Sequence, residues 1–415
     1  MNILILTQWF DPEPNNMKAL AFAKGLKDRG HMVTVLTGFP NYPTGKLYSG
    51  YHLKLYQKET LHAIPIHRVC LYPNHDSSSI CRIINYTSFA FFAALIGPWV
   101  VKGKIDVIYV YHPPATVMLP ALILRFIKKA GILLDVNDLW PDTIISTGML
   151  KQKWPLKIIT AWMNYSYRKA DRINVLSAGV KAFLVERHVS PDKISIIPVW
   201  CNENLLKEPI QTDFRKQFNL QNCFLGIYAG AMGRAQNLTV LLAAAEIMQT
   251  KLPDFKLLLI GHGVCLKELQ KLVHTKKLNN VIFIPVLPPE KLTGILYHAD
   301  VLFVQLKKDP LFAVTIPSKT AYYLSLGKPI IAGLSGDAAR MLEASKGGIV
   351  CEPEAADEIA AAIFRIYQMD LSERNAMGAC GREYYKKYLS MDAGIIAFEN
   401  ELCKAAGLNK DKAIR

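Results

Sequence analysis

Short apolar runs alternate with longer amphipathic runs along the first half of the chain. A run of consecutive apolar residues is typical of a strand buried on both faces, and apolar positions three or four residues apart are typical of a helix. The expected strands are Asn2–Thr7, Met32–Thr37, Ile105–Tyr111, Ile132–Asn137, Arg172–Leu176 and Lys193–Ile197. The expected helices include Asn16–Arg29, Ala115–Lys129, Pro155–Lys169 and Gly179–Arg187. This alternation indicates a parallel sheet with helices on both faces.

The same alternation starts again after a polar segment, Leu205–Gln221, which contains Pro209 and reads as a linker. The second series of strands is expected at Phe224–Tyr228, Lys256–Ile260, Val281–Ile284, Val301–Gln305, Ile330–Ala332 and Ile349–Cys351. The helices between them are expected at Leu238–Gln249, Val264–Thr275 and Lys291–His298. A chain of 415 residues is too long for one core. We therefore predict an α/β protein of two Rossmann-like, doubly wound domains, whose ligand-binding strand edges can face one cleft.

A hydroxyl, a lysine and backbone N–H groups are expected at one helix N-terminus in the second half. The strand ending at Gln305 leads into a loop, and Ser318 and Lys319 open a helix that stops at Gly327. A helix N-terminus favours negative charge, and a lysine there neutralises phosphate charge that backbone dipoles only partly offset. We therefore predict that this helix start binds an anion.

Glycines follow two other strands of the second half. Gly230 and Gly233 come after the first of these strands, and Gly261 and Gly263 come after the next. A strand-to-helix turn often needs glycine for its geometry alone, but glycine also lets the backbone approach a ligand. Because the glycines recur at equivalent strand ends, we expect them at the same anion-binding edge as Lys319.

Acidic side chains follow two strands of the first half. Asp138 lies in the segment Asp135-Val136-Asn137-Asp138-Leu139-Trp140-Pro141-Asp142, and Asp11 and Glu13 lie in the proline-rich turn after the first strand. A carboxylate at a strand end can bind hydroxyl groups or act as a general base, while capping and packing are the structural alternatives. His112 ends another strand and is a further candidate, although a lone histidine is more often structural.

The formal net charge is +15, with 49 basic and 34 acidic residues. Such a balance favours nucleic acids, anionic lipids or phosphorylated small molecules. No nucleic-acid-binding motif accompanies it, so we expect no nucleic-acid partner. The eight cysteines show no Cys-x-x-Cys spacing, so neither zinc nor disulfides are expected, and no metal or cofactor is predicted.

Two apolar segments raise the question of a membrane. Met1–Leu6 lacks a basic start and is soon followed by Asp11, so we expect a buried strand rather than a signal sequence. Ile83–Val101 carries no charge over nearly the ~20 residues of a spanning helix. Core packing, insertion into a membrane surface and a true span are the alternatives for it. Asn85 and the Gly97–Pro98 pair argue against the span.

Seven segments occur along the chain in an order that characterises one enzyme family. They are Asp11-Pro12-Glu13, Asp138-Leu139-Trp140-Pro141-Asp142, Tyr228-Ala229-Gly230 with Gly233-Arg234-Ala235-Gln236-Asn237-Leu238, Gly261-His262-Gly263, Ala299-Asp300, Pro317-Ser318-Lys319 and Gly327-Lys328-Pro329. Together they resemble glycosyltransferase family 4, and in particular the bacterial surface-polysaccharide branch that includes N-acetylfucosamine transferases. The resemblance spans almost the whole chain.

The resemblance implies a GT-B fold with an acceptor-binding domain at 1–205, a donor-binding domain at 206–383 and C-terminal helices at 384–415 that cross back to the first domain. It also implies retention of anomeric configuration without a metal. The implied donor-binding residues are Gly230, Gly233, Arg234, Gln236, Gly261, Gly263, Val286, Ser318, Lys319 and Tyr322. The implied catalytic residues are Asp138, Glu13 and Lys319, and the acceptor side holds Asp11, Asn137 and His112.

The sequence departs from the family's pattern at several positions. Val314 and Tyr322 stand where many members have paired glutamates, the second of which holds the ribose hydroxyls. Ala231 and Gln236 stand where many members have an arginine and a lysine, and Asn137 aligns with a catalytic-loop histidine. Arg234 and Lys319 remain as the basic candidates for the diphosphate.

We therefore expect a retaining, metal-independent hexosyltransferase at the cytoplasmic face of the plasma membrane. Its donor is expected to be UDP-linked, with an N-acetylated deoxysugar as one candidate. Its acceptor is expected to be a lipid-linked saccharide in capsule, O-antigen or exopolysaccharide assembly. A nucleotide-sugar epimerase of the UDP-GlcNAc 2-epimerase type and a non-catalytic GT-B partner subunit are the alternatives.

Overall fold

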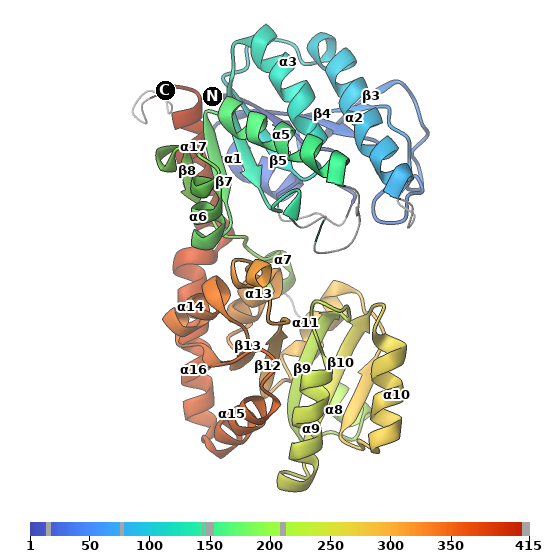
Figure 1. Ribbon diagram of the computed structural model, residues 1–415, viewed down its shortest axis with the longest axis vertical. Coiled ribbons are helices and arrows are strands. Elements are labelled where there is room, and N and C mark those ends of the chain that lie inside the picture. The colour runs from blue at the N-terminus through green and yellow to red at the C-terminus, as the bar shows by residue number, and fades with distance from the viewer. Residues whose placement is uncertain (14–17, 75–78, 143–144, 146–152, 208–212, 409–415) are drawn as a thin grey trace. The chain divides into compact units, whose positions relative to one another are not determined.

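The apolar runs form the strands of two sheets, one in each of two compact units (Figure 1). The structure is a computed structural model that describes residues 1–13, 18–74, 79–142, 145, 153–207 and 213–408. The first unit comprises Met1–Pro198 and Gly394–Arg415, and the second comprises Val199–Ala393.

The first unit contains an eight-stranded sheet with the order β3-β4-β2-β1-β5-β6-β7-β8. Its strands are β1 (Asn2–Leu6), β2 (Met32–Gly38), β3 (Tyr56–Leu61), β4 (Ile64–Val69), β5 (Val107–His112), β6 (Gly131–Val136), β7 (Arg172–Val175) and β8 (Ile194–Ile196). Every neighbouring pair is parallel except β3 and β4, which are antiparallel. The helices are α1 (Leu20–Asp28), α2 (Ser79–Val100), α3 (Met118–Lys128), α5 (Lys153–Lys169), α6 (Ala178–Glu186) and α17 (Met391–Ala405), with 3₁₀ turns at Ala115–Val117 and Pro191–Lys193.

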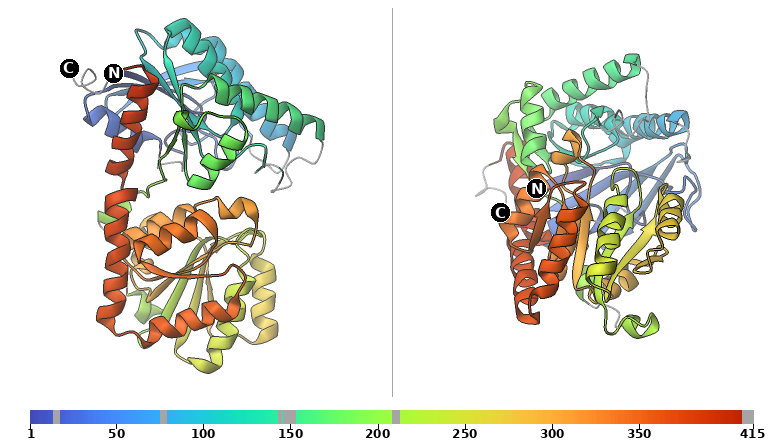
Figure 2. Two further views of the ribbon diagram at one scale, coloured as in Figure 1. Left: turned by 60° about the vertical axis from the view of Figure 1, so that its left-hand side comes forward. Right: turned by 60° about the horizontal axis from the view of Figure 1, so that its bottom comes forward.

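Helices cover both faces of this sheet. Tyr109 of β5 contacts aromatic rings of α1 and α17, with ring centroids 4.9 Å from Phe22 and 5.7 Å from Phe398. The other face carries α2, because Leu36 of β2, in register with Val110 through β1, packs against Gly97 of α2. Consecutive strand residues point to opposite faces, so α1 and α17 lie opposite α2. The helices α2, α3 and α5 lie along that second face (Figure 1 and the left view of Figure 2).

The C-terminal helix α17 is held in the first unit by two of its glutamates. Glu399 accepts hydrogen bonds from Arg29 and His31, and Glu401 forms an ion pair with Arg172. The division between the units falls at Gly394, so α16 (Leu371–Tyr384) and the π-helical turn Tyr385–Leu389 belong to the second unit. The family resemblance had implied a return to the first domain from residue 384.

The second unit contains a six-stranded parallel sheet with the order β11-β10-β9-β12-β13-β14. Its strands are β9 (Phe224–Ala231), β10 (Phe255–His262), β11 (Val281–Ile284), β12 (Val301–Gln305), β13 (Ile330–Gly333) and β14 (Gly348–Cys351). Its remaining helices are α7 (Asn204–Lys207), α8 (Phe214–Gln217), α9 (Thr239–Lys251), α10 (Leu266–Lys276), α11 (Pro289–Leu296), α12 (Pro310–Ala313), α13 (Ser318–Leu326), α14 (Gly336–Ser345) and α15 (Ala356–Gln368).

Two apolar cores lie on the two faces of this second sheet. Leu225 and Ile227 of β9 belong to one core with residues of α11, α13 and α14, whereas Phe224 and Tyr228 belong to the other with residues of α9 and α15. This alternation explains why the strands are apolar at consecutive positions: both faces are covered.

The structure corrects several predicted boundaries. The helix predicted at 16–29 begins at Leu20, where the Asp11 carboxylate accepts the backbone N–H; residues 16 and 17 lie outside the described residues. The helix predicted at Ala115–Lys129 starts with a 3₁₀ turn and ends at Lys128, because Lys129 adopts a left-handed conformation with φ of 54°. The hairpin β3–β4 was missed because its first strand is largely polar and lies at the sheet edge.

Candidate active site

The turns after β9 and β10 pack backbone against backbone. Gly230 and Gly261 are register partners with φ of 139° and 141°, values that favour glycine. A Cβ on Gly261 would overlap the carbonyl oxygen of Gly230, and a Cβ on Gly263 would overlap that of Met232. Close backbone packing within the protein therefore explains why these positions are glycine. Their contact with a ligand stays a prediction.

Lys319 lies at this same edge. Helix α13 is fixed to β9 by the Tyr323 hydroxyl, which accepts a hydrogen bond from the Ala229 N–H and lies 3.2 Å from the Ala229 carbonyl. The Lys319 Nζ lies 3.8 Å from the ring centroid of Tyr228, and a Cβ on Gly230 would come within 2.9 Å of it. Gly230 thus leaves the space that the ammonium occupies.

The Lys319 ammonium is buried and has no hydrogen-bond partner in the part of the chain that the structure describes. Burial lowers its pKa from 10.5 to about 7. Beside it, Ser318 is exposed at the first position of α13, and no side chain caps this helix start. A buried cation without a counter-ion next to uncapped backbone N–H groups is an arrangement that an anion would stabilise.

The other residues predicted on the donor side differ from one another in exposure and in hydrogen bonding. Arg234 is exposed, and Val286 follows β11 and is 68% exposed. The Gln236 Oε1 accepts the backbone N–H of Gly233, so this side chain shapes the turn. The Tyr322 hydroxyl lies 2.6 Å from that of Thr293 on α11, and burial raises the pKa of Tyr322 to about 12.

Three residues at this edge were missed from the sequence. Tyr228 lies under the Lys319 ammonium, and the Oγ1 of Thr320 and the Oε1 of Gln305 are buried without hydrogen-bond partners among the described residues. Tyr228 stands two positions before Gly230 at a strand end, and this spacing places both on one face of the strand. The alternation of side chains along the strand was therefore the signal that could have identified Tyr228. Neither Gln305 nor Thr320 carries a comparable pattern.

In the first unit, a buried ion pair organises the end of β6. The Lys18 Nζ lies 2.7 Å from Asp135 Oδ2, with both side chains almost completely buried, and also donates to Asn137. Asp135 further accepts hydrogen bonds from Tyr109 and Asn174. Lys18 was not predicted from the sequence, because this pair joins positions 117 residues apart. The predicted acceptor-side residue Asn137 is thus held in place by it.

Glu13 requires a correction. Its side chain is completely buried, and its two oxygens accept the backbone N–H groups of Phe10, Asn41 and Tyr42. Burial raises the pKa of Glu13 to about 7. Because no solvent-accessible surface remains on it, Glu13 joins two loops rather than facing an acceptor. Asp11 similarly accepts the N–H of Leu20 at the start of α1.

His112 lies in an aromatic cluster at the end of β5. Its ring is 5.7 Å from that of Trp140, which lies 6.1 Å from Tyr86, and Tyr86 lies 6.1 Å from Trp9. Both ring nitrogens of His112 are buried and lack hydrogen-bond partners among the described residues. Burial lowers the pKa of His112 to about 4, so the ring is neutral near pH 7 and is no proton donor there.

Asp138 is an accessible carboxylate at this edge. Its side chain is exposed, and no described residue donates a hydrogen bond to its carboxylate. Neighbouring protein atoms nevertheless raise the pKa of Asp138 above its ordinary value by desolvation. An exposed, unpaired carboxylate is chemically suited to accept a proton from a hydroxyl group.

Two family models match the chain in succession. A glycosyl transferase 4-like domain matches residues 17–200, and a domain described as glycosyl transferases group 1 matches residues 210–384. The chain is a GT-B glycosyltransferase of family 4. The resemblance drawn from the sequence is confirmed, as are the fold class and the assignment as an enzyme.

Curated proteins and solved structures are similar to this glycosyltransferase over most of its length. A putative colanic acid biosynthesis glycosyl transferase, WcaI of Escherichia coli, is 24% identical over 97% of this chain and all of the relative. The probable glycosyltransferase WbjE of Pseudomonas aeruginosa is 23% identical over 69% of this chain and 72% of the relative. The Anabaena protein HepE in complex with UDP superposes with a TM-score of 0.71 at 15% identity, covering 97% of this chain and 99% of its own.

The glycosyltransferase differs from the family's pattern where ribose is normally bound. Tyr322 replaces the second glutamate, and its hydroxyl is engaged by Thr293 on α11. Val314, in place of the first glutamate, directly follows α12. No cluster of three or more His, Cys, Asp or Glu side chains suited to a metal occurs within the described ranges.

Proposed function

We propose that this glycosyltransferase transfers a sugar, with retention, from a UDP-linked donor to a lipid-linked saccharide in the assembly of a bacterial surface polysaccharide. The observation that carries the proposal is the buried ammonium of Lys319, which lies without a hydrogen-bond partner among the described residues at the uncapped start of α13. A nucleotide diphosphate supplies the negative charge that this position lacks.

The names of similar proteins support the donor and the pathway class. One relative is named for colanic acid biosynthesis. The HepE structure contains UDP, and a further structural neighbour from E. coli, with a TM-score of 0.72 at 12% identity, is described as bound with UDP-2-fluoro glucose. We extend these donors to this chain as UDP-linked sugars, with N-acetylated deoxysugars among the candidates.

The proposed chemistry needs positive groups for the leaving diphosphate and a base for the acceptor hydroxyl. Lys319, Ser318 and Arg234 of the second unit would stabilise the leaving diphosphate, as fixed positive groups stabilise developing charge. Asp138 of the first unit would accept the proton of the attacking hydroxyl. Asn137 and His112 would position the acceptor side, and a lipid-linked acceptor would place the enzyme at the cytoplasmic membrane face.

The direct test is a thermal-shift screen of the purified protein against UDP- and GDP-linked sugars, followed by a transfer assay with the donor found. A ligand that binds the native state raises the melting temperature. We expect a UDP-sugar to stabilise the protein and Lys319→Ala to lose most of that shift. Lys276→Ala, which removes an exposed ion pair with Glu246, serves as the matched control and should keep it.

The transfer assay separates the remaining alternatives. Turnover that persists with EDTA, together with an α-linked product from an α-linked donor, is the expected result. Donor binding without transfer to any lipid-linked acceptor would instead indicate a non-catalytic subunit. Conversion of the donor sugar in the absence of acceptor would indicate an epimerase. Full stabilisation of the Lys319→Ala variant by the donor would remove this lysine from the mechanism.

A further inference from the structure

Helix α2 presents apolar side chains on the side that faces away from the sheet. Tyr86, Phe89 and Ala93 are buried against the unit. The opposite side carries exposed residues at spacings of three, four and seven: Ile80, Ile83, Ile84, Phe91, Leu95 and Trp99. An amphipathic surface helix normally has polar residues there, so this outer side requires a partner other than water.

Two neighbouring helices continue the same surface. On α3, Leu119, Phe126 and Ile127 are exposed, with Phe126 at 85% and Trp99 of α2 at 80%. On α5, the exposed apolar residues are Trp154, Ile158 and Tyr165, again spaced as one helix side. Gly97 of α2 packs beside Leu124 of α3, which places the C-terminal ends of these two helices next to each other. We call the outer side of α2, α3 and α5 the apolar face.

The charge of the apolar face has one sign. None of the three helices contains an Asp or a Glu, and their basic residues include Arg125, Lys128, Lys157, Arg168 and Lys169. Lys102 and Lys129, which follow α2 and α3, are exposed as well. Helices of the second unit, by contrast, carry acidic residues such as Glu268 and Asp357. Exposed apolar residues on helices that carry basic but no acidic residues complement a layer of anionic lipid headgroups.

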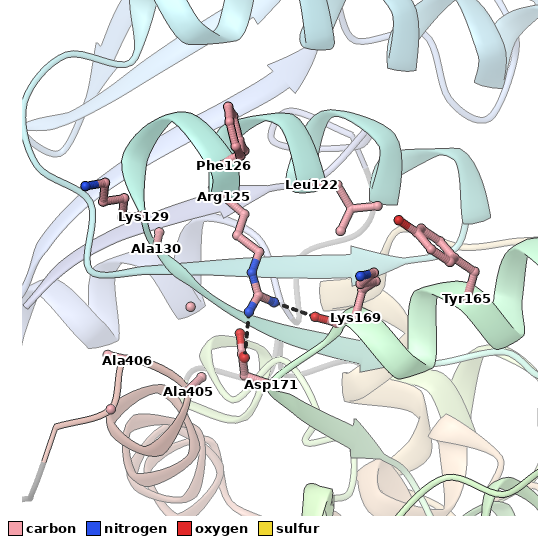
Figure 3. A pocket seen from close by; sticks show the side chains of 12 residues that line it. Leu122, Arg125, Phe126, Lys129, Ala130, Tyr165, Lys169, Asp171, Ala405 and Ala406 are labelled. Carbon is pink, nitrogen blue, oxygen red and sulfur yellow. Dashed lines mark hydrogen bonds and ion pairs between the residues drawn. The ribbon is translucent and has the colours of Figure 1, made fainter.

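A recess of about 630 Å³ lies at the border of this face, between the C-terminal ends of α3, α5 and α17 (Figure 3). Leu122, Phe126 and Tyr165 line it together with Arg125 and Lys169. Arg125 donates to Asp171 and to the Lys169 carbonyl, whereas the Lys169 ammonium has no ion pair among the described residues. The recess lies where β6 begins, and Asn137 follows the other end of that strand, so it is separate from the predicted catalytic edge.

Helix α2 is long and apolar enough by length and composition to cross a membrane. However, its Asn85 accepts a hydrogen bond from Gln8 and donates to Asn41 and to the Tyr72 carbonyl. The Tyr86 carbonyl also accepts a hydrogen bond from Thr116. A spanning position would break these contacts and expose their polar groups to hydrocarbon. The helix can lie in a membrane surface without breaking any of them.

We propose that the apolar face docks onto a bilayer containing anionic phospholipids, with Trp99 and Phe126 inserted and the surrounding lysines and arginines at the headgroups. This inference rests on the proposed function, to which it adds the surface that brings the enzyme to a lipid-linked acceptor. Apolar burial supplies the attraction, and headgroup charge makes it sensitive to salt.

The test is sedimentation of the full-length protein with vesicles of phosphatidylcholine alone or with about one third phosphatidylglycerol. We expect binding to the anionic vesicles that weakens as salt rises, and at least tenfold weaker binding for Phe126→Gln and for Trp99→Gln. Leu371→Gln, at an exposed leucine of the second unit, is the matched control and should bind as the wild type does. Lys129→Glu should weaken binding, whereas Lys267→Glu on α10 should not.

Three results would overturn the proposal. The first is absence of wild-type binding, or equal binding by all variants. The second is a dimer in light scattering that Phe126→Gln dissociates without any vesicle binding, which would assign the face to self-association. The third is resistance to alkaline carbonate extraction, which would indicate a span. Thermal shift with the donor is measured on the same variants, because it reports the proposed function independently of vesicle binding.

Discussion

Lys319 shows how much a single side chain depends on its surroundings. The residue lies on the first turn of α13, yet its ammonium is enclosed by the ring of Tyr228 and the backbone of Gly230. Burial without a counter-ion disfavours the charged form. The pKa of about 7 therefore makes the charge of this group sensitive to pH near neutrality.

We predict that UDP binding at pH 8 takes up close to one proton through Lys319. The diphosphate favours the ammonium and raises its pKa, so the free protein gains a proton on binding above pH 7 and gains almost none at pH 6. Affinity then falls as pH rises above 7, by up to roughly tenfold per unit. Calorimetry in two buffers of different ionisation enthalpy measures the uptake. Lys319→Arg, which stays charged, should abolish it; uptake by that variant would contradict the assignment.

The environment of Glu13 gives this residue a structural role in place of the catalytic role predicted from the sequence. Three backbone N–H groups donate to its buried carboxylate. Each N–H left without an acceptor costs about 1–3 kcal/mol. We therefore predict that Glu13→Ala lowers the free energy of unfolding of the first unit by roughly 3 kcal/mol, as measured by urea unfolding. Glu246→Ala, which removes an exposed ion pair, should change it by less than about 1 kcal/mol. If both substitutions changed the free energy of unfolding equally, the buried hydrogen bonds of Glu13 would be contradicted, because only a solvated carboxylate would behave in that way.

At the scale of elements, the position of α13 decides the donor site. Tyr323 holds this helix to β9, and Gly327 ends it with φ of 68°. The Arg382 guanidinium of α16 lies against Gly327 and donates to the Leu326 carbonyl. The last turn of α13 is thus supported from a helix far along the chain.

We predict that Gly327→Ala destabilises the second unit by about 2 kcal/mol. The added Cβ would meet Arg382 atoms at 2.7–2.8 Å in a backbone conformation that non-glycine residues rarely adopt. Gly30 provides the comparison, because its φ is 88° and no atom lies within 4 Å of an added Cβ. Gly30→Ala should therefore lower stability by the backbone strain alone, about 1 kcal/mol. Chemical denaturation of both variants measures the difference. A cost no larger for Gly327→Ala would show that Arg382 moves away freely.

At the scale of the whole molecule, two units with separate cores share one chain that passes between them twice. The segments beside these passages are bound to each other within the second unit. Glu203 accepts hydrogen bonds from the Tyr385 hydroxyl and from the Met391 N–H, and Tyr385 also contacts Cys201. This contact joins the first passage of the chain to the second.

We predict that UDP slows amide hydrogen exchange most in the turns after β9 and β10 and at the start of α13. Ligand binding stabilises the elements that contact it, and exchange through local opening reports this. Mass spectrometry with and without UDP provides the measurement, and the Lys319→Ala variant provides the control. Protection confined to the first unit would place the nucleotide elsewhere.

The alternation of apolar runs and amphipathic stretches predicted the parallel strands of both sheets, because strands covered on both faces are apolar at consecutive positions. The sequence also predicted α13 from Ser318 to Gly327, because the residues that indicate its start and its end lie close together along the chain. The polar strand β3 and the true start of α1 escaped prediction, because sheet-edge pairing and the contact of Asp11 with Leu20 are not visible in local patterns.

The sequence by itself thus determined the fold class, the family and the strand edges at which the candidate site lies. Only the tertiary structure decided which side chains at those edges are accessible. In the folded protein Glu13 is buried and hydrogen-bonded to the backbone, whereas Asp138 is exposed. Lys18 forms an ion pair with Asp135, and the Lys319 ammonium packs against the ring of Tyr228. The tertiary structure also turned one apolar side of α2 to the core and the other outward. Burial depends on residues distant in the chain that meet only in the folded protein, and no local pattern contains that information.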